Sequence, residues 1–114
     1  MWELWQYRKV LGDVLDSQAE DLDSVKVRLR VLLERGSNCR RPITAHLEDG
    51  IFEFRGSGET RVLFYFGASR QIVFVHAFQK KKGKVDRRDI EMAKRRRSEI
   101  QEASTDVHRF ASKL

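Results

Sequence analysis

Three apolar runs in the middle of the chain constrain the fold more than any other feature of the sequence. They span residues 45–55 (AHLEDGIFEFR), 61–67 (RVLFYFG) and 71–78 (QIVFVHAF), and the links between them contain GSG at 56–58 and GASR at 67–70. β-Branched and aromatic residues recur in all three runs and dominate the second and third, which is typical of strands. Links this short join antiparallel neighbours, because a parallel connection needs a crossover of about a dozen residues or more. The sequence therefore predicts an antiparallel meander.

The segment before the meander carries one strand signal and two helix signals. Residues 2–8 (WELWQYR) are aromatic and alternate, which predicts a short strand, and residues 10–16 predict a helical turn. From Asp21 onward, leucines and valines recur at helical spacing until Gly36. A glycine in this position is typical of the residue that follows a helix, so we expect the second helix to end there.

The segment after the meander predicts a basic helix. Apolar residues between Ile90 and Leu114 keep to one helical face, and a break near Ser104 and Thr105 is left open. Together these elements predict a single α+β domain over residues 1–114. We expect an antiparallel sheet of about four strands, mixed at one edge, with the N-terminal helices packed on one face and the other face open.

Positive charge is concentrated just after the third apolar run. Residues 80–97 hold ten Lys and Arg against three acids, a local charge of +7 in a chain whose formal charge is +6. Such a segment favours a polyanionic partner, of which nucleic acid and an acidic protein are the two main classes. We expect the KRRR run at 94–97 to be a solvated helix face, with Arg97 interrupting the apolar stripe and either snorkelling or pairing with an acid.

Several protein classes are excluded or disfavoured by what the sequence lacks. A single cysteine, Cys39, excludes an internal disulfide and a Cys-based zinc site. No apolar stretch approaches the roughly 18 residues of a membrane span. A Gly-rich phosphate loop, a GxSxG motif and a His/Asp metal cluster are also missing, which argues against nucleotide hydrolysis and metal catalysis. We therefore expect a cytoplasmic protein without a cofactor.

Strand alternation predicts which charged side chains meet. Residues two apart share a face of a sheet, so Glu53 and Arg55 point together, as do Arg61 and Tyr65 on the next strand. The Phe-rich faces are the expected core, which leaves these four residues on the opposite surface. The triple lysine at 80–82 follows the last strand and adds to this cationic surface, which suits phosphate oxygens.

RNA cleavage is one chemistry that such a surface can support. The dianionic phosphorane would be stabilised by four cations, namely Arg55, Arg61, Lys80 and Lys81. The residues expected to contact substrate or move protons are Glu53, Tyr65, His76, Lys82 and Lys84, with Tyr65 able to stack on an unpaired base. The alternatives are a solvated face with ordinary charges and, for a lone strand histidine such as His76, a structural role.

The order of motifs over residues 46–97 resembles the RelE/ParE superfamily of type II toxins, in particular its phage-associated HigB-like branch. The matching elements are Leu47, the Asp49-Gly50 pair, Glu53-Phe54-Arg55, Arg61-Val62, the HAFQKK stretch at 76–81 and Ala93 with its flanking cations. One departure concerns the C-terminal helix, where better-known RelE enzymes carry a tyrosine and this chain has no phenol near Ile90.

The resemblance implies a RelE-like fold and a toxin that cleaves messenger RNA, commonly on the ribosome. It maps the family's catalytic or RNA-binding positions onto Arg55, Arg61 and Lys80 or Lys81. It also implies a cognate antitoxin, expected to carry a helix-turn-helix DNA-binding domain, with operator DNA contacted only through that antitoxin. A non-catalytic module that binds RNA, the ribosome or the antitoxin remains the alternative, and no membrane partner is expected.

Overall fold

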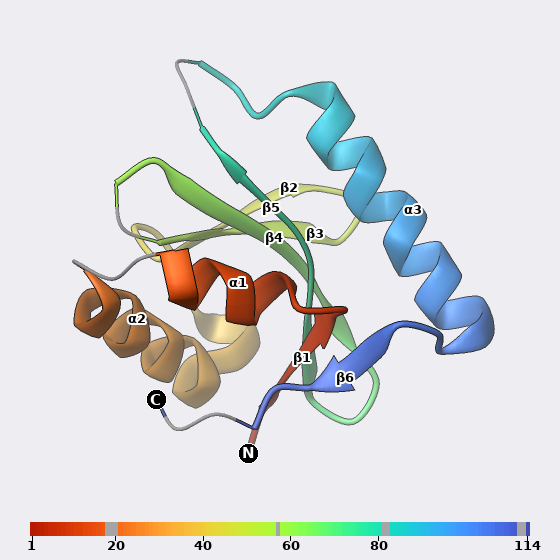
Figure 1. Cartoon of the computed structure of the whole chain (residues 1–114), viewed down its shortest axis with the longest axis horizontal. Helices are drawn as coiled ribbons and strands as arrows, with labels where there is room; N and C mark the ends of the chain where they lie inside the picture. Colours follow the sequence, from red (N-terminus) through yellow and green to blue (C-terminus); the bar gives the residue numbers. More distant parts are fainter. Residues whose placement is uncertain (18–20, 57, 81–82, 112–113) are drawn as a thin grey trace.

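A mixed six-stranded sheet runs through the middle of the molecule (Figure 1). The computed structural model describes residues 1–17, 21–56, 58–80, 83–111 and 114. Its strands are β1 (Glu3–Tyr7), β2 (Thr44–Glu48), β3 (Ile51–Arg55), β4 (Thr60–Gly67), β5 (Gln71–Gln79) and β6 (Val107–Arg109). They lie in the order β2-β3-β4-β5-β1-β6, with β1 parallel to β5 and the other neighbours antiparallel. The predicted α+β class and the β3-β4-β5 meander are confirmed.

The first apolar run is a hairpin of two strands, which is one reason the sheet exceeds the expected four strands. Residues Asp49 and Gly50 form its tip with φ angles of 48° and 76°. Two consecutive positive φ angles are the signature of a tight hairpin turn, and an Asp-Gly pair favours that turn. The chain therefore folds back at this pair, and β2 lies beside β3 at the edge of the sheet.

Helices cover both faces of the sheet. Helices α1 (Val10–Ser17) and α2 (Leu22–Arg35) pack on the face that carries Phe54, Phe64 and Phe74. Helix α3 (Arg87–Ala103) packs on the other face (Figure 1). The expectation that this second face is open is therefore wrong. Its strands present a second apolar set, which includes Ile51, Leu63 and Val73, and this set needs burial as much as the phenylalanines do.

The C-terminal segment is a helix followed by a strand. Helix α3 ends at Ala103, and Ser104 adopts a left-handed conformation with φ of 52° while its N–H donates to the Ile100 carbonyl. This geometry terminates a helix and turns the chain back. The break left open at Ser104 and Thr105 is confirmed, but the expected helix beyond it is replaced by β6, which pairs with β1 and adds the sixth strand.

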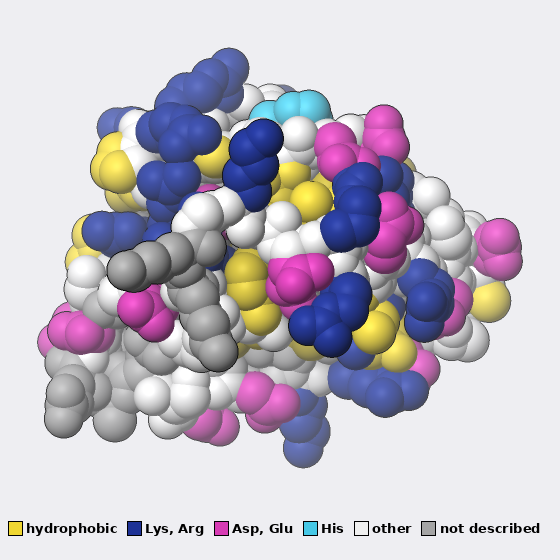
Figure 2. All heavy atoms as spheres, turned by 90° about the horizontal axis from the view of Figure 1, so that it is seen from above, with side chains coloured by type: hydrophobic (Ala, Val, Ile, Leu, Met, Phe, Trp, Pro, Cys, Tyr) yellow, Lys and Arg dark blue, Asp and Glu magenta, His cyan; other side chains and the backbone are white. Residues whose placement is uncertain are grey.

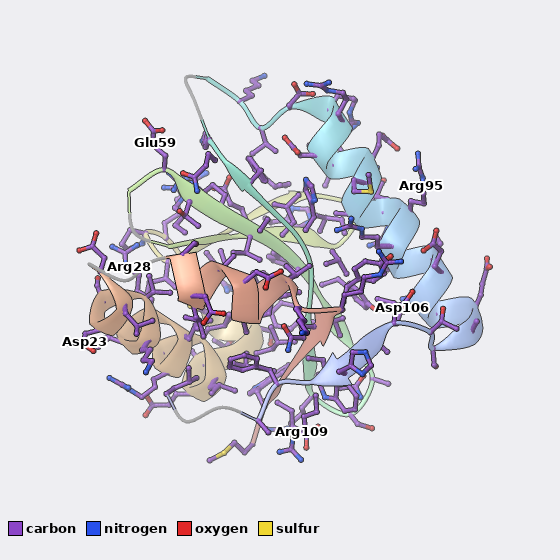
Figure 3. The ribbon with its side chains drawn as sticks, in the orientation of Figure 1. Asp23, Arg28, Glu59, Arg95, Asp106 and Arg109 are labelled. Atoms are coloured by element: carbon purple, nitrogen blue, oxygen red, sulfur yellow. The ribbon has the colours of Figure 1, made fainter. Side chains whose placement is uncertain are left out.

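Three of the four cations in the KRRR run hold α3 against the sheet. Lys94 binds the carboxylates of Glu48 and Asp49, and Arg97 donates to the Asp49 carbonyl oxygen. Arg96 donates to the Val75 carbonyl at 2.6 Å. Arg95, by contrast, projects away from the body of the molecule (Figure 3). The prediction of a solvated helix face is therefore confirmed for Arg95 alone within this run.

None of the helices in the described part of the chain is both long enough and apolar enough to span a membrane. Helix α3 has 17 residues, and its sequence RRDIEMAKRRRSEIQEA is strongly polar.

Candidate functional site: a cationic pocket around Glu53

Three charged side chains meet on the α3 face where β3 ends and β4 begins, namely Glu53, Arg55 and Arg61. Arg55 lies directly opposite Arg61 in the antiparallel register of these strands. Glu53 precedes Arg55 by two residues and therefore shares its face. Residues directly opposite in a sheet have Cβ atoms about 5 Å apart, which is close enough for their side chains to share a partner. The predicted meeting of Glu53, Arg55 and Arg61 is confirmed.

Glu53 is the shared partner of the two arginines and is only 1% exposed. Its Oε1 accepts a hydrogen bond from Arg55 Nε at 3.0 Å and lies 4.0 Å from Arg61 Nε. Its Oε2 and the Nε of Arg61 are buried without a hydrogen-bond partner among the described residues. One carboxylate compensates one guanidinium, so the cluster carries a net positive charge. Because a buried charge needs its counter-ion, Glu53 holds both arginines in place.

A pocket of about 480 Å³ opens beside this cluster, between the β2–β3 hairpin and the segment that leads into α3. Its charged wall consists of Arg41, Glu48, Glu53, Arg55, Lys80 and Lys84. We call it the cationic pocket. The backbone of Lys80 is held at the wall of this pocket, because its N–H donates to the Glu59 carbonyl at 2.7 Å. The pocket therefore gathers cations from β3, from the end of β5 and from the loops on either side.

The carboxylates of the cationic pocket are already neutralised by partners in the protein. Glu48 is bound by Arg87 and Lys94 from α3, and Glu53 by Arg55. The view onto this end of the molecule shows Lys and Arg gathered on one side, and Lys and Arg interspersed with Asp and Glu on the other (Figure 2). The remaining positive charge is available to an anion such as a phosphate.

The other predicted site residues are not gathered in this pocket. Tyr65 lies beneath α3 with 4% exposure, and this burial raises the pKa of its phenol. The expectation that Tyr65 reaches an open surface is wrong, because α3 covers that face. His76 lines a different pocket and binds Asp89. Lys81 and Lys82 lie outside the described residues.

The sequence did not indicate three polar residues of the cationic pocket, namely Arg41, His46 and Glu48. Arg41 comes from the loop before β2, and His46 lies on β2 next to the residue that pairs with Glu53. Treating the Asp49-Gly50 pair as a hairpin turn would have placed His46 beside β3. Arg41 has no comparable signal, because its position depends on how the loop packs. Among the described residues, no cluster of three His, Cys, Asp or Glu side chains is suited to a metal ion.

Lys94 sets the ionisation of the two acids at the hairpin tip. Its hydrogen bonds lower the pKa of Glu48 from the ordinary 4.5 and that of Asp49 from the ordinary 3.8. The same contacts raise the pKa of Lys94 from its ordinary 10.5. The two acids therefore stabilise the fold above their ordinary pKa values and lose that effect as the pH falls through the lowered ones. The lysine stabilises it below 10.5 and loses that effect at higher pH.

Replacing Lys94 with methionine is expected to lower the melting temperature at neutral pH. The difference from the wild type should shrink as the pH falls below 4.5, because the partner carboxylates become protonated. Thermal unfolding at a series of pH values measures this difference. Arg95→Met is the control, since Arg95 projects away from the fold (Figure 3). An equal and pH-independent loss in both variants would contradict a specific role for Lys94.

Comparison with known proteins places the chain in a family. A family model described as Phage derived protein Gp49-like (DUF891) matches residues 13–98, which is more than half of the chain. The match includes β2 to β5 and most of α3, and so it covers Arg41, Glu53, Arg55, Lys80 and Lys84 of the cationic pocket. The search of curated proteins found no match. The chain belongs to the Gp49-like family of phage-derived proteins, which is a RelE/ParE-like toxin family.

Proposed function

We propose that this chain is the toxin of a type II toxin–antitoxin system and cleaves messenger RNA on the ribosome without a metal ion. Membership of a toxin-like family supports the first part of this proposal. The cationic pocket carries the second part, because Arg55 and Lys80 line a cavity beside a buried carboxylate that holds the arginines in place.

In the proposed reaction, the 2′-oxygen of one nucleotide attacks the adjacent phosphorus and the 5′-oxygen of the next nucleotide leaves. The 2′-proton is lost and the leaving oxygen gains a proton, so the products are a 2′,3′-cyclic phosphate and a 5′-hydroxyl. Charge builds up on the phosphorane between these two events, and cations already in place stabilise it most effectively. Arg55, Arg61 and Lys80 are assigned this role.

The remaining polar residues of the site have supporting roles in this proposal. Glu53 is a positioning residue, because its Oε1 holds Arg55 Nε at 3.0 Å and it is too buried to meet a long substrate directly. Lys84 and Arg41 are exposed on the rim of the cationic pocket and suit the phosphates on either side of the reacting one. Lys80 is assigned to the reacting phosphate because it is partly buried at the wall of the same cavity.

A toxin-like family implies a cognate antitoxin. We place an acidic segment of that antitoxin over the cationic pocket, since complementary charge favours this contact and would also block RNA. Operator DNA is then contacted through a DNA-binding domain of the antitoxin.

Mapping the 5′ ends of cellular messenger RNA tests the proposed function. After brief induction in cells without the antitoxin, we expect new ends that are spaced by codons and carry a 5′-hydroxyl. Treatment of the purified protein with a chelator, followed by removal of the chelator before intact ribosomes are added, is expected to leave the cleavage rate unchanged. Growth arrest without new ends would contradict the nuclease and favour the non-catalytic module that occupies RNA or the ribosome.

A further inference from the structure

The arginine row of the site continues onto β5 with an aromatic residue. Phe78 lies directly opposite Arg61 in the β4–β5 register, just as Arg55 lies opposite Arg61 on the other side. Neighbouring strands are about 4.8 Å apart, so the backbones of Phe78 and Arg61 are separated by one strand spacing. Both side chains lie on the α3 face, and Phe78 is only partly buried there.

The Phe78 ring is held parallel to a histidine. The ring centroids of Phe78 and His76 are 5.8 Å apart, and their planes differ by 20°. Two residues apart on β5, these side chains share a face. The histidine is fixed in turn, because its Nε2 lies 2.7 Å from Asp89 Oδ1 in the first turn of α3. The stacked His76 ring therefore restrains the Phe78 ring from one side, and a ring that is already held in place lowers the entropic cost of binding a planar ligand.

Two further pockets, which share lining residues, connect this pair to the cationic pocket. A side pocket of about 450 Å³ is lined by His76, Phe78 and Arg96, among others. A middle pocket of about 400 Å³ is lined by Phe78, Lys80 and Lys84. The cationic pocket shares Lys80 and Lys84 with the middle one. A chain of alternating phosphates and flat rings can therefore follow one continuous surface.

We propose that Phe78, supported by His76, is the stacking platform for an unpaired RNA base next to the phosphate held at Arg61. This inference rests on the proposed nuclease function and names a base subsite for the same site. Stacking on an aromatic side chain is the common way in which proteins hold unpaired bases. Tyr65 cannot stack on a base because it is buried beneath α3, and Phe78 is assigned that role instead.

The test measures binding of a single-stranded 2′-O-methyl oligoribonucleotide, which cannot be cleaved because it lacks the 2′-hydroxyl. Phe78→Leu is expected to weaken binding by about 5- to 150-fold, the usual cost of losing one stacked base. Phe78→Trp keeps a flat ring and is expected to stay within about twofold of the wild type. The matched control is Phe66→Leu, because Phe66 is also partly buried but packs on the opposite face. It too should stay within about twofold.

A second arm removes the base from the RNA instead of the ring from the protein. Abasic nucleotides are placed in turn at each position of the oligoribonucleotide. At one position, the missing base is expected to lower the affinity of the wild type by about 5- to 150-fold. The same missing base is expected to leave the affinity of Phe78→Leu almost unchanged. The wild type alone shows whether any base is stacked, so this arm can still overturn the platform if Phe78→Leu fails to fold.

The possible outcomes separate the subsite from the nuclease. If the wild type generates new messenger RNA ends in cells and Phe78→Leu binds RNA like Phe66→Leu, the platform is overturned and the nuclease stands. The platform is also overturned if no single abasic position matters in the wild type. If the wild type generates no new ends and binds no RNA, the proposed function itself fails, and the subsite falls with it.

Discussion

Replacing Arg61 with alanine is expected to lower the rate of messenger RNA cleavage by about 10²- to 10³-fold, the usual loss when one fixed charge-stabilising group is removed. Arg61 shares Glu53 with Arg55, and its side chain is anchored by hydrogen bonds from Nη1 to the carbonyls of Gly58 and Thr60 at 2.9 and 3.0 Å. A guanidinium held in this way needs no reorganisation during the reaction. The rate of appearance of new 5′ ends, measured on programmed ribosomes, gives the effect.

Charge-matched variants distinguish a catalytic loss from a general loss of positive charge. Arg95→Ala removes the same charge from a side chain that points away from the sheet, and its cleavage rate should stay within about twofold of the wild type (Figure 3). Arg61→Lys keeps the charge but not the planar fork, so an intermediate rate is expected. Equal losses in Arg61→Ala and Arg95→Ala would indicate electrostatic attraction to RNA rather than catalysis at Arg61.

Replacing Gly36 with alanine is expected to destabilise the fold by about 3 kcal/mol or more, through strain and overpacking together. A Cβ at this position would lie 2.0 Å from Cε2 and 2.1 Å from Nε1 of Trp2. The φ angle of Gly36 is also +53°, which L side chains rarely adopt. Chemical denaturation with a linear extrapolation measures the change in the free energy of unfolding.

Gly58 provides the matched control for this prediction. Its φ angle is +59°, but a Cβ there would meet no atom within 4 Å. Gly58→Ala therefore reports the cost of backbone conformation alone, expected to be about 1 kcal/mol. If the two variants lose equal stability, the close approach of Trp2 to Gly36 contributes nothing, and the proposed clash is wrong.

Local features of the sequence were sufficient to predict most strands and helices. Alternation over 61–67 places Arg61 on one face with Leu63 and Tyr65, as the structure confirms. The helix that ends at Gly36 was likewise predicted, and the Gly36 N–H caps it by donating to the Leu32 carbonyl. These features depend on neighbours a few residues away, which is why a single sequence is enough to predict them.

The candidate site was predicted only in part. Short links determine the register of β3 and β4, so the meeting of Glu53, Arg55 and Arg61 follows from sequence. The deep burial of Glu53 and the contribution of Arg41 do not follow. Both depend on segments that reach the site through long-range packing, and nothing in the local pattern encodes where such segments arrive.

Along a regular strand such as β4, the local pattern is enough to predict which side chains share a face, but tertiary packing sets which of those faces meets solvent. Tyr65 and Phe78 are both aromatic strand residues, yet α3 buries Tyr65 and leaves Phe78 partly exposed beside Lys80. Side-chain direction repeats every two residues along a regular strand and is a local property there. The register shift in β5 interrupts this alternation, so Phe78 lies on the face opposite to Phe74. Exposure depends on what packs against the face. Here α3 determines it, because Lys94, Arg96 and Arg97 hold this helix against the sheet.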